Sequence, residues 1–162
     1  MVVSAPLVSQ TSPVPGSLSC FVDGVVQHGS HGAGGWVIQD ASGVLLASAA
    51  RRYQGLQDPT LVELLALRDA VRWCSDRCWF SVTFMGDAQI VFQKVKAGEV
   101  HDALGGALLQ EIQALRSSFQ HFDCVFVGRN RNRVAHIVAR KALSLRPPLL
   151  VGFDVVAWLR SL

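Results

Sequence analysis

Charged residues are scarce in this sequence, and long hydrophobic runs are missing. Only 17% of its 162 residues are charged and 50% are hydrophobic, a composition that excludes disordered, collagen-like and coiled-coil proteins. The longest segment without a charge is residues 1–22, but its Ser, Gln, Thr and Pro residues make it a poor bilayer span. No basic region precedes it as in a secretory signal. We therefore expect one compact, soluble, intracellular domain without a membrane segment.

Cysteine is also infrequent. Four cysteines are too few for a disulfide framework in a chain of this length. Three of them, Cys20, Cys74 and Cys124, lie in apolar runs, where a thiol behaves as a small hydrophobic group. Cys74 and Cys78 have nearly the spacing of zinc ligands, but no second Cys or His pair follows at the required interval. We expect reduced thiols and no zinc site.

Lysine and arginine are missing from the first fifty residues of the chain. Residues 1–50 contain neither, whereas six basic residues and no acidic residue lie between Cys124 and Phe153, although the net charge is only +3. A local positive potential favours a polyanionic partner, because phosphate contacts release counterions. A solvated helix face explains the same pattern, and charge alone favours that alternative.

The order of sequence periods predicts an α/β domain. Alternating apolar residues predict three antiparallel strands, two of which are joined by a turn at Asp40–Gly43. Helical and strand periods then alternate, and strands joined by helical crossovers are normally parallel. The predicted strands are residues 18–26, 35–39, 44–50, 80–85 and 122–128, and the predicted helices are residues 61–74, 88–97, 104–119 and 131–143.

The ends of the chain differ in composition from this domain, which we place at residues 17–146. Residues 1–16 show no helix or strand period and are predicted to be a flexible leader. Residues 147–162 begin with two prolines and form an apolar tail that we expect to pack on the domain. In the alternative, residues 149–162 bind a protein partner. We expect a monomer.

Three carboxylates occupy unusual positions. Asp23 lies within a predicted strand, where an unpaired carboxylate is costly to bury; its alternative role is a hairpin turn with Gly24. Glu63 lies on the apolar face of a helix, or forms a capping box with Thr60. Asp87 follows a strand at the end where ligands bind, or caps the next helix.

These three carboxylates converge if Asp23 and Asp87 lie on adjacent strands and Glu63 faces them from the helix between those strands. Clustered carboxylates repel one another and raise each other's pKa unless a divalent cation neutralises them. Hard oxygen ligands select Mg²⁺ or Mn²⁺. The residues therefore predict a carboxylate metal site near a basic segment.

Several segments in this order carry a family resemblance. They are "FVDGV", "GAGGWVIQDASG", "TLVELLALRDAV", "MGDAQIVFQKV" and "VGRNRNRVAHIVARKAL". From about Leu18 to Leu143 the chain resembles the ribonuclease H family, in particular the plant ribonuclease H-like domains associated with retroelement reverse transcriptases. The resemblance implies a ribonuclease H-like fold: a five-stranded mixed sheet, with three antiparallel strands and then two parallel ones, flanked by helices.

The same resemblance implies an enzyme that hydrolyses the RNA strand of RNA/DNA hybrids with two Mg²⁺ or Mn²⁺ ions. Asp23, Glu63 and Asp87 match the metal ligands, and Asp23 is expected to bridge both ions. His136 stands where many members have a fourth acidic residue; we include it among the catalytic residues, and plant-type relatives frequently carry His there. The residues expected to contact nucleic acid are Gly24, Lys94, Lys96, Arg129, Arg131, Asn132 and Arg133.

Two alternatives remain open. A catalytically weak ribonuclease H-like domain would bind nucleic acid without cutting it, with the carboxylates serving as caps. A protein-interaction domain would use the apolar tail.

Overall fold

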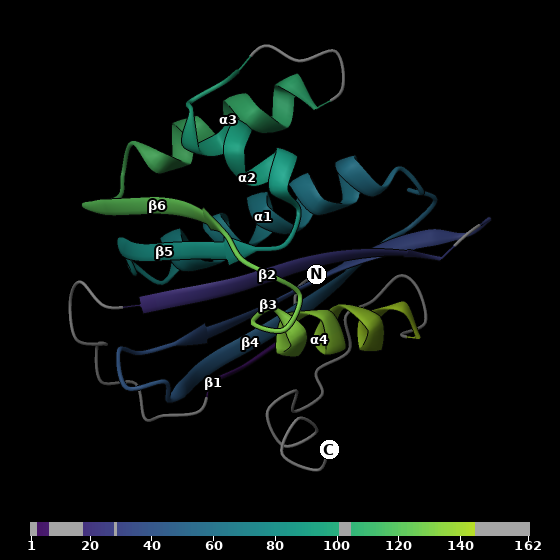
Figure 1. The fold of residues 1–162 in the computed structure, drawn as a ribbon, viewed down its shortest axis with the longest axis horizontal. Coiled ribbons are helices and arrows are strands. Elements are labelled where there is room, and N and C mark those ends of the chain that lie inside the picture. The colour runs from purple at the N-terminus through teal and green to yellow at the C-terminus, as the bar shows by residue number, and fades with distance from the viewer. Residues whose placement is uncertain (1–2, 7–17, 28, 101–104, 145–162) are drawn as a thin grey trace.

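The computed structural model describes residues 3–6, 18–27, 29–100 and 105–144. Its strands form a single sheet in the order β1-β4-β3-β2-β5-β6 (Figure 1). No helix in these ranges is long and apolar enough to cross a membrane. The strands are β1 (Val3–Pro6), β2 (Leu18–Gln27), β3 (His31–Gln39), β4 (Leu45–Tyr53), β5 (Ser81–Gly86) and β6 (His121–Phe126). The helices are α1 (Pro59–Asp76), α2 (Gln89–Lys96), α3 (Gly106–Arg116) and α4 (Arg133–Leu143).

The predicted five-stranded mixed sheet is confirmed. Strands β2, β3 and β4 are antiparallel, β5 is parallel to β2, and β6 is parallel to β5. The predicted turn after β3 is also present, since Asp40 Oδ1 accepts from the backbone N–H groups of Ser42 and Val44 at 2.8 and 3.0 Å. Gly43 adopts a φ of 81°, which disfavours other residues.

A short sixth strand was not predicted. β1 lies in the segment expected to be a flexible leader, and it pairs antiparallel with β4. Four residues are too few to show a period, and their pairing depends on the open edge of β4. The rest of that segment, residues 1–2 and 7–16, and the apolar tail, residues 147–162, lie outside the described residues.

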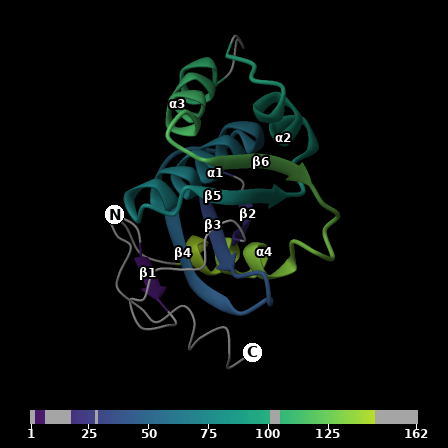
Figure 2. The ribbon, with the colours of Figure 1, turned by 90° about the vertical axis from the view of Figure 1, so that its left-hand side faces the viewer.

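The helices cover the two faces of the sheet unequally. Figures 1 and 2 show α1, α2 and α3 on one face and α4 on the other. The larger core lies under the three helices and includes Trp36, Leu67 and Phe84, all fully buried. A smaller core lies under α4 and includes Val37 and Val138. The central strands β2 and β3 are therefore packed on both sides.

Two adjacent glycines in β3 allow both helices to approach closely. A Cβ atom on Gly34 would lie 2.8 Å from Ala66 Cβ of α1, and one on Gly35 would lie 2.5 Å from the backbone nitrogen of Ala139 in α4. Because successive strand residues point to opposite faces, these glycines serve opposite layers. The glycine-rich segment of the sequence thus sets the distance of α1 and α4 from the sheet.

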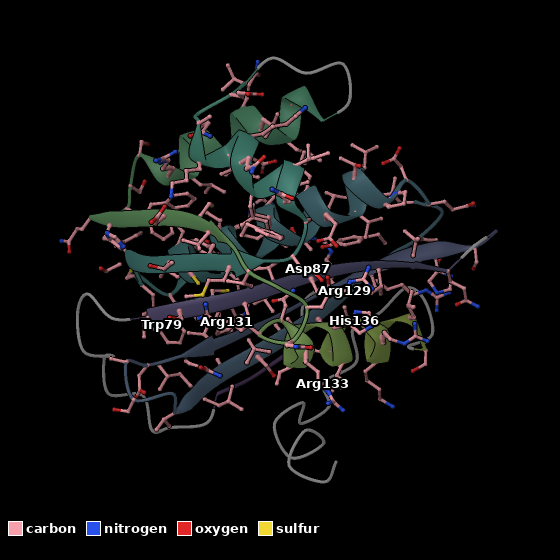
Figure 3. All side chains as sticks on the ribbon, viewed as in Figure 1. Trp79, Asp87, Arg129, Arg131, Arg133 and His136 are labelled. Carbon is pink, nitrogen blue, oxygen red and sulfur yellow. The ribbon has the colours of Figure 1, made fainter. Side chains whose placement is uncertain are left out.

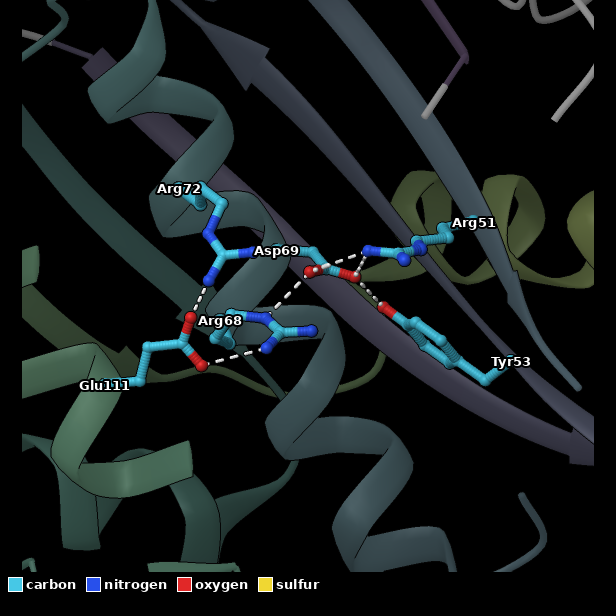
Figure 4. A network of polar contacts seen from close by, with 6 residues as sticks. All are labelled: Arg51, Tyr53, Arg68, Asp69, Arg72 and Glu111. Carbon is cyan, nitrogen blue, oxygen red and sulfur yellow. Dashed lines mark hydrogen bonds and ion pairs between the residues drawn. The ribbon is translucent and has the colours of Figure 1, made fainter. Parts of the chain in front are cut away.

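A network of hydrogen bonds and ion pairs joins α1 to β4 and α3 (Figure 4). Asp69 of α1 is only 4% exposed and accepts hydrogen bonds from Tyr53 Oη at 2.7 Å and Arg68 Nε at 2.8 Å. The polar side of α1 therefore packs against other parts of the protein and not against solvent, because β4 and α3 lie beside it. Such a buried carboxylate is tolerated because each of its oxygens has partners. The complete network comprises Arg51, Tyr53, Arg68, Asp69, Arg72 and Glu111.

Substituting Gly35→Ala is expected to lower the free energy of unfolding by about 1–3 kcal/mol, because the added methyl group meets the backbone of α4. Urea denaturation measures the change. The matched control is Gly128→Ala, where a Cβ would have no neighbour within 4 Å among the described residues. Equal unfolding free energies for the two variants would contradict the packing argument.

Candidate functional site

Asp23 lies within a strand and not in a turn. It pairs with Gly35 in the middle of the β2–β3 ladder and is only 3% exposed. The hairpin-turn alternative for Asp23 and Gly24 is therefore wrong. Burial of this carboxylate next to two packed helices requires neutralising partners.

Glu63 faces Asp23 from α1. The helix begins two residues earlier than a cap at Thr60 requires, since its N-cap is Asp58, whose side chain accepts from Leu61 N at 2.9 Å. The capping-box alternative is therefore wrong. Glu63 Oε2 instead accepts from Gly24 N at 3.1 Å. A Cβ on Gly24 would lie 2.9 Å from the Glu63 backbone, so glycine permits this contact between strand and helix.

Asp87 completes the cluster from the carboxyl end of β5. It precedes α2, but the N-cap of that helix is Ala88 and no side chain caps it, so the alternative role of Asp87 as a cap is wrong. Oxygen atoms of Asp23, Glu63 and Asp87 all lie within 4.8 Å of one another. The convergence expected from the strand and helix positions is thus present.

The electrostatics of this cluster are unfavourable without a cation. Burial, followed by the negative charges of Asp23 and Asp87, raises the pKa of Glu63 to about 10. Burial also raises the pKa of Asp23 to about 6, against the lowering effect of its hydrogen bond with His136. A hydrogen bond between the two carboxyl groups raises the pKa of Glu63 and lowers that of Asp23. Glu63 therefore retains its proton at neutral pH.

His136 approaches Asp23 from the opposite side of the sheet. It lies on α4, and its Nδ1 is 2.7 Å from Asp23 Oδ2. Half of its side chain is exposed, compared with 4% for that of Asp23. Figure 3 shows His136 and Asp87 on either side of β2. Asp23 is thus contacted from both helical layers.

The cluster lines a pocket of about 510 Å³ that also has a basic wall. This wall contains Arg129 and Arg133. Both were among the arginines expected to contact nucleic acid. Asn130 lies between them in the sequence and was not predicted as a site residue. Its position in the arginine-rich segment was the sequence signal that could have identified it. The lining residues are Asp23, Gly24, Glu63, Asp87, Ala88, Arg129, Asn130, Arg133 and His136.

Other predicted contact residues lie outside the pocket. Arg131 points along the sheet toward Met85, with 3.9 Å between Nη2 and Sδ (Figure 3). Lys94 and Lys96 lie on α2, and Lys96 Nζ is 3.5 Å from a carboxylate oxygen of Asp123 on the edge strand β6. The structure thus separates these residues from Arg129 and Arg133.

Asn132 is a correction to the predicted nucleic-acid surface. It is only 1% exposed, and its Nδ2 donates to Val22 O at 2.9 Å. A residue this deeply buried has no surface for a substrate. Its contact instead joins the start of α4 to the strand residue that precedes Asp23, so we assign it a positioning role.

The donor set of the pocket fits a divalent cation. Three carboxylates supply hard oxygen ligands, the kind that Mg²⁺ and Mn²⁺ prefer. Their mutual repulsion is the energetic problem that a bound cation removes. Asp23, Glu63 and Asp87 are the residues that would hold it.

Comparisons with known proteins agree with this geometry. The model of the reverse transcriptase-like family matches residues 21–142. The structure is similar to RNase H1 from the halophilic archaeon Halobacterium salinarum, with a TM-score of 0.71, 20% identity, and coverage of 78% of this chain and 96% of that one. It is also similar to the N-terminal RNase H domain of a Mycobacterium tuberculosis protein, with a TM-score of 0.70, 19% identity, and coverage of 78% and 92%.

A third similar structure is LC11-RNase H1 in complex with an RNA/DNA hybrid, with a TM-score of 0.67, 16% identity, and coverage of 78% of this chain and 99% of that one. A search of curated proteins finds no match. At these identities the similar structures establish the fold, which is that of ribonuclease H.

Without divalent cations, the protein is expected to lose stability as the pH rises. The pKa of Glu63 is raised from 4.5 to about 10, so the folded state holds a proton that the unfolded state releases. Between about pH 5 and pH 9 the free energy of unfolding should fall by at least about 1.4 kcal/mol, the value of one pKa unit. Addition of Mg²⁺ should abolish this fall. Thermal melting in EDTA and in Mg²⁺ measures both effects.

Asp87→Asn separates this effect from general alkaline destabilisation. Removing one charge from the cluster should raise the melting temperature in EDTA by about 2–4 °C for each kcal/mol of repulsion relieved. The same variant should lose most of the stabilisation by Mg²⁺. A variant that melts like the unaltered protein under both conditions would argue against a shared cation site.

Proposed function

Because this chain belongs to the reverse transcriptase-like family, we propose that it is a metal-dependent endonuclease that hydrolyses the RNA strand of RNA/DNA hybrids. The observation that carries the proposal is the convergence of Asp23, Glu63 and Asp87 opposite Arg129 and Arg133 in one pocket. An acidic wall that holds cations and a basic wall that holds phosphate are the two requirements of phosphodiester hydrolysis.

The charged residues of the pocket and His136 each have a defined task in this proposal. Asp23, Glu63 and Asp87 hold two Mg²⁺ or Mn²⁺ ions during hydrolysis. Two such ions, when bound, supply an activated water and stabilise the leaving 3′-oxygen of the phosphodiester. His136 donates from Nδ1 to Asp23 Oδ2 and so orients that carboxylate.

The substrate class follows from two lines of support. The fold is similar to that of a ribonuclease H1 in complex with an RNA/DNA hybrid. A hybrid also offers 2′-hydroxyl groups on one strand only, and these groups distinguish RNA from DNA. Arg129 and Arg133, both exposed, contact phosphates next to the cleaved bond.

A second candidate function is binding of nucleic acid without cleavage. The observation that favours it is His136, which contacts the central carboxylate but brings no negative charge to the pocket. Imidazole is a poorer partner for Mg²⁺ than a carboxylate. The two candidates differ in turnover and share the binding surface.

Cleavage of an end-labelled RNA/DNA hybrid is expected in Mg²⁺ or Mn²⁺, with no cleavage of RNA or DNA duplexes. Asp87→Asn should lower the rate by about 10²-fold or more, because several kcal/mol of transition-state stabilisation are lost. The matched control is Asp76→Asn at the exposed end of α1, which should cut at the unaltered rate. A folded protein that binds the hybrid and cuts in neither metal would favour the second candidate.

Binding of the hybrid is expected to depend on Arg129 and Arg133. Substituting either by alanine should reduce the slope of log affinity against log salt concentration by about one unit, because one phosphate contact is lost. Fluorescence anisotropy over a salt series measures the slope. Arg140→Ala serves as the control, since Arg140 is exposed on α4 but does not line the pocket. Equal slopes for all three variants would remove the arginines from the proposed interface.

A further inference from the structure

Helix α4 covers only part of its face of the sheet. It packs on β2, β3 and β4, while the other three helices lie on the opposite face (Figures 1 and 2). Among the described residues, no helix packs on the α4 side of β5 and β6. We call this region, together with the adjoining residues 18–21 of β2, the open face.

An apolar row crosses the open face. Phe21 of β2 pairs with Met85 of β5, and Met85 pairs with Val125 of β6. Each of the three follows a strand residue of the larger core, so its side chain points to the α4 side of the sheet. All three are partly exposed, and none belongs to either core. The row is therefore apolar surface that the described helices leave uncovered.

Arg131 brings a positive charge to this row. Its side chain is exposed and lies along the sheet, with Nη2 3.9 Å from Met85 Sδ (Figure 3). It belongs to the same segment as Arg129 and Arg133, which line the pocket. The basic segment thus serves two surfaces, since Arg131 points away from the pocket and over the apolar row.

The neighbouring row of the open face is polar. It consists of Ser19, Thr83 and Asp123, which are paired across the three strands. Thr83 Oγ1 lies 3.4 Å from Nε2 of the exposed His121, and a carboxylate oxygen of Asp123 lies 3.5 Å from Lys96 Nζ. The open face therefore combines apolar side chains, hydrogen-bonding groups and an exposed cation.

The open face begins next to the carboxylate cluster. Phe21 precedes Asp23 by two residues on β2, and Met85 precedes Asp87 by two residues. Two residues of a strand span roughly 7 Å. A nucleic-acid strand that leaves the pocket on the α4 side therefore meets the apolar row directly.

We propose that the open face binds a single-stranded extension of the nucleic acid held in the pocket, with unpaired bases on the apolar row and a phosphate on Arg131. This inference rests on the proposed nuclease function and adds a second binding surface to it. Bases inside a duplex are stacked on one another, so only unpaired bases have free faces for Phe21. Such stacking tolerates any sequence, because every base has a π-face. A protein segment is the alternative occupant, but the exposed cation beside the row favours a polyanion.

Fluorescence anisotropy tests the inference with a blunt RNA/DNA hybrid and with hybrids in which the RNA or the DNA strand is extended at either end. The RNA strand carries 2′-O-methyl groups and so resists cleavage. At least one extension should tighten binding by about tenfold, the effect of one stacked base. A fluorescent base analogue in that extension should be quenched on binding, because it stacks on Phe21.

Two variants should remove most of this gain. Phe21→Leu keeps an apolar side chain without the ring, and Arg131→Ala removes the cation. The matched control is Phe126→Leu, since Phe126 is 45% exposed on β6 but points to the opposite side of the sheet, as Cys124 does. The control should keep the full gain. The measured quantity is the ratio of extended to blunt affinity within each variant, so a general change in binding cancels.

The outcomes separate this inference from the proposed function. Equal affinities for blunt and extended hybrids would overturn the inference and leave the nuclease proposal intact, with the apolar row free for a protein partner. A gain that survives both Phe21→Leu and Arg131→Ala would overturn it as well. Because Arg131 is exposed, its variant decides the matter even if Phe21→Leu fails to fold. By contrast, a folded protein that neither binds nor cuts the blunt hybrid contradicts the proposed function itself.

Discussion

Asp23 brings a carboxylate to the middle of the sheet, where 3% of the residue is exposed and both faces are packed. Such a group is stable only if other groups compensate its charge. The structure supplies His136 from one helical layer and the protonated Glu63, hydrogen-bonded to Asp23, from the other. This compensation requires α1 and α4 to pack close to β2.

Glycine makes those positions sterically possible. Gly24 admits the backbone of Glu63, while Gly34 and Gly35 admit α1 and α4 to opposite faces of β3. Side chains at these positions would push the helices away and separate Glu63 and His136 from Asp23. Glycine weakens a strand because it has no side chain to pack, but here it lets the helices come close enough to form the site. This role explains why glycine is frequent in the hairpin of β2 and β3.

Acidic and basic groups reach the pocket from different parts of the chain. The carboxylates come from β2, α1 and the residue after β5, whereas Arg129 lies in the loop before α4 and Arg133 is the first residue of α4. This division places rigid ligands on one wall and exposed, longer side chains on the other. A polyanion can then meet the basic wall while the acidic wall keeps its geometry.

The sequence alone determined the order of strands and helices from β2 to α4, the mixed sheet, and the places of Asp23, Glu63 and Asp87 on those elements, because periodicity and element ends are local properties. The three carboxylates meet because β2 and β5 are neighbours in the sheet. Tertiary structure decided the rest. Arg129, Arg131 and Arg133 alternate in one segment, yet only the first and last line the pocket, and neighbouring Asn132 is buried. His136 and Asp23 are 113 residues apart, so their contact depends on how α4 packs across the sheet. Local patterns do not record such packing, and it decides which predicted residues share a site.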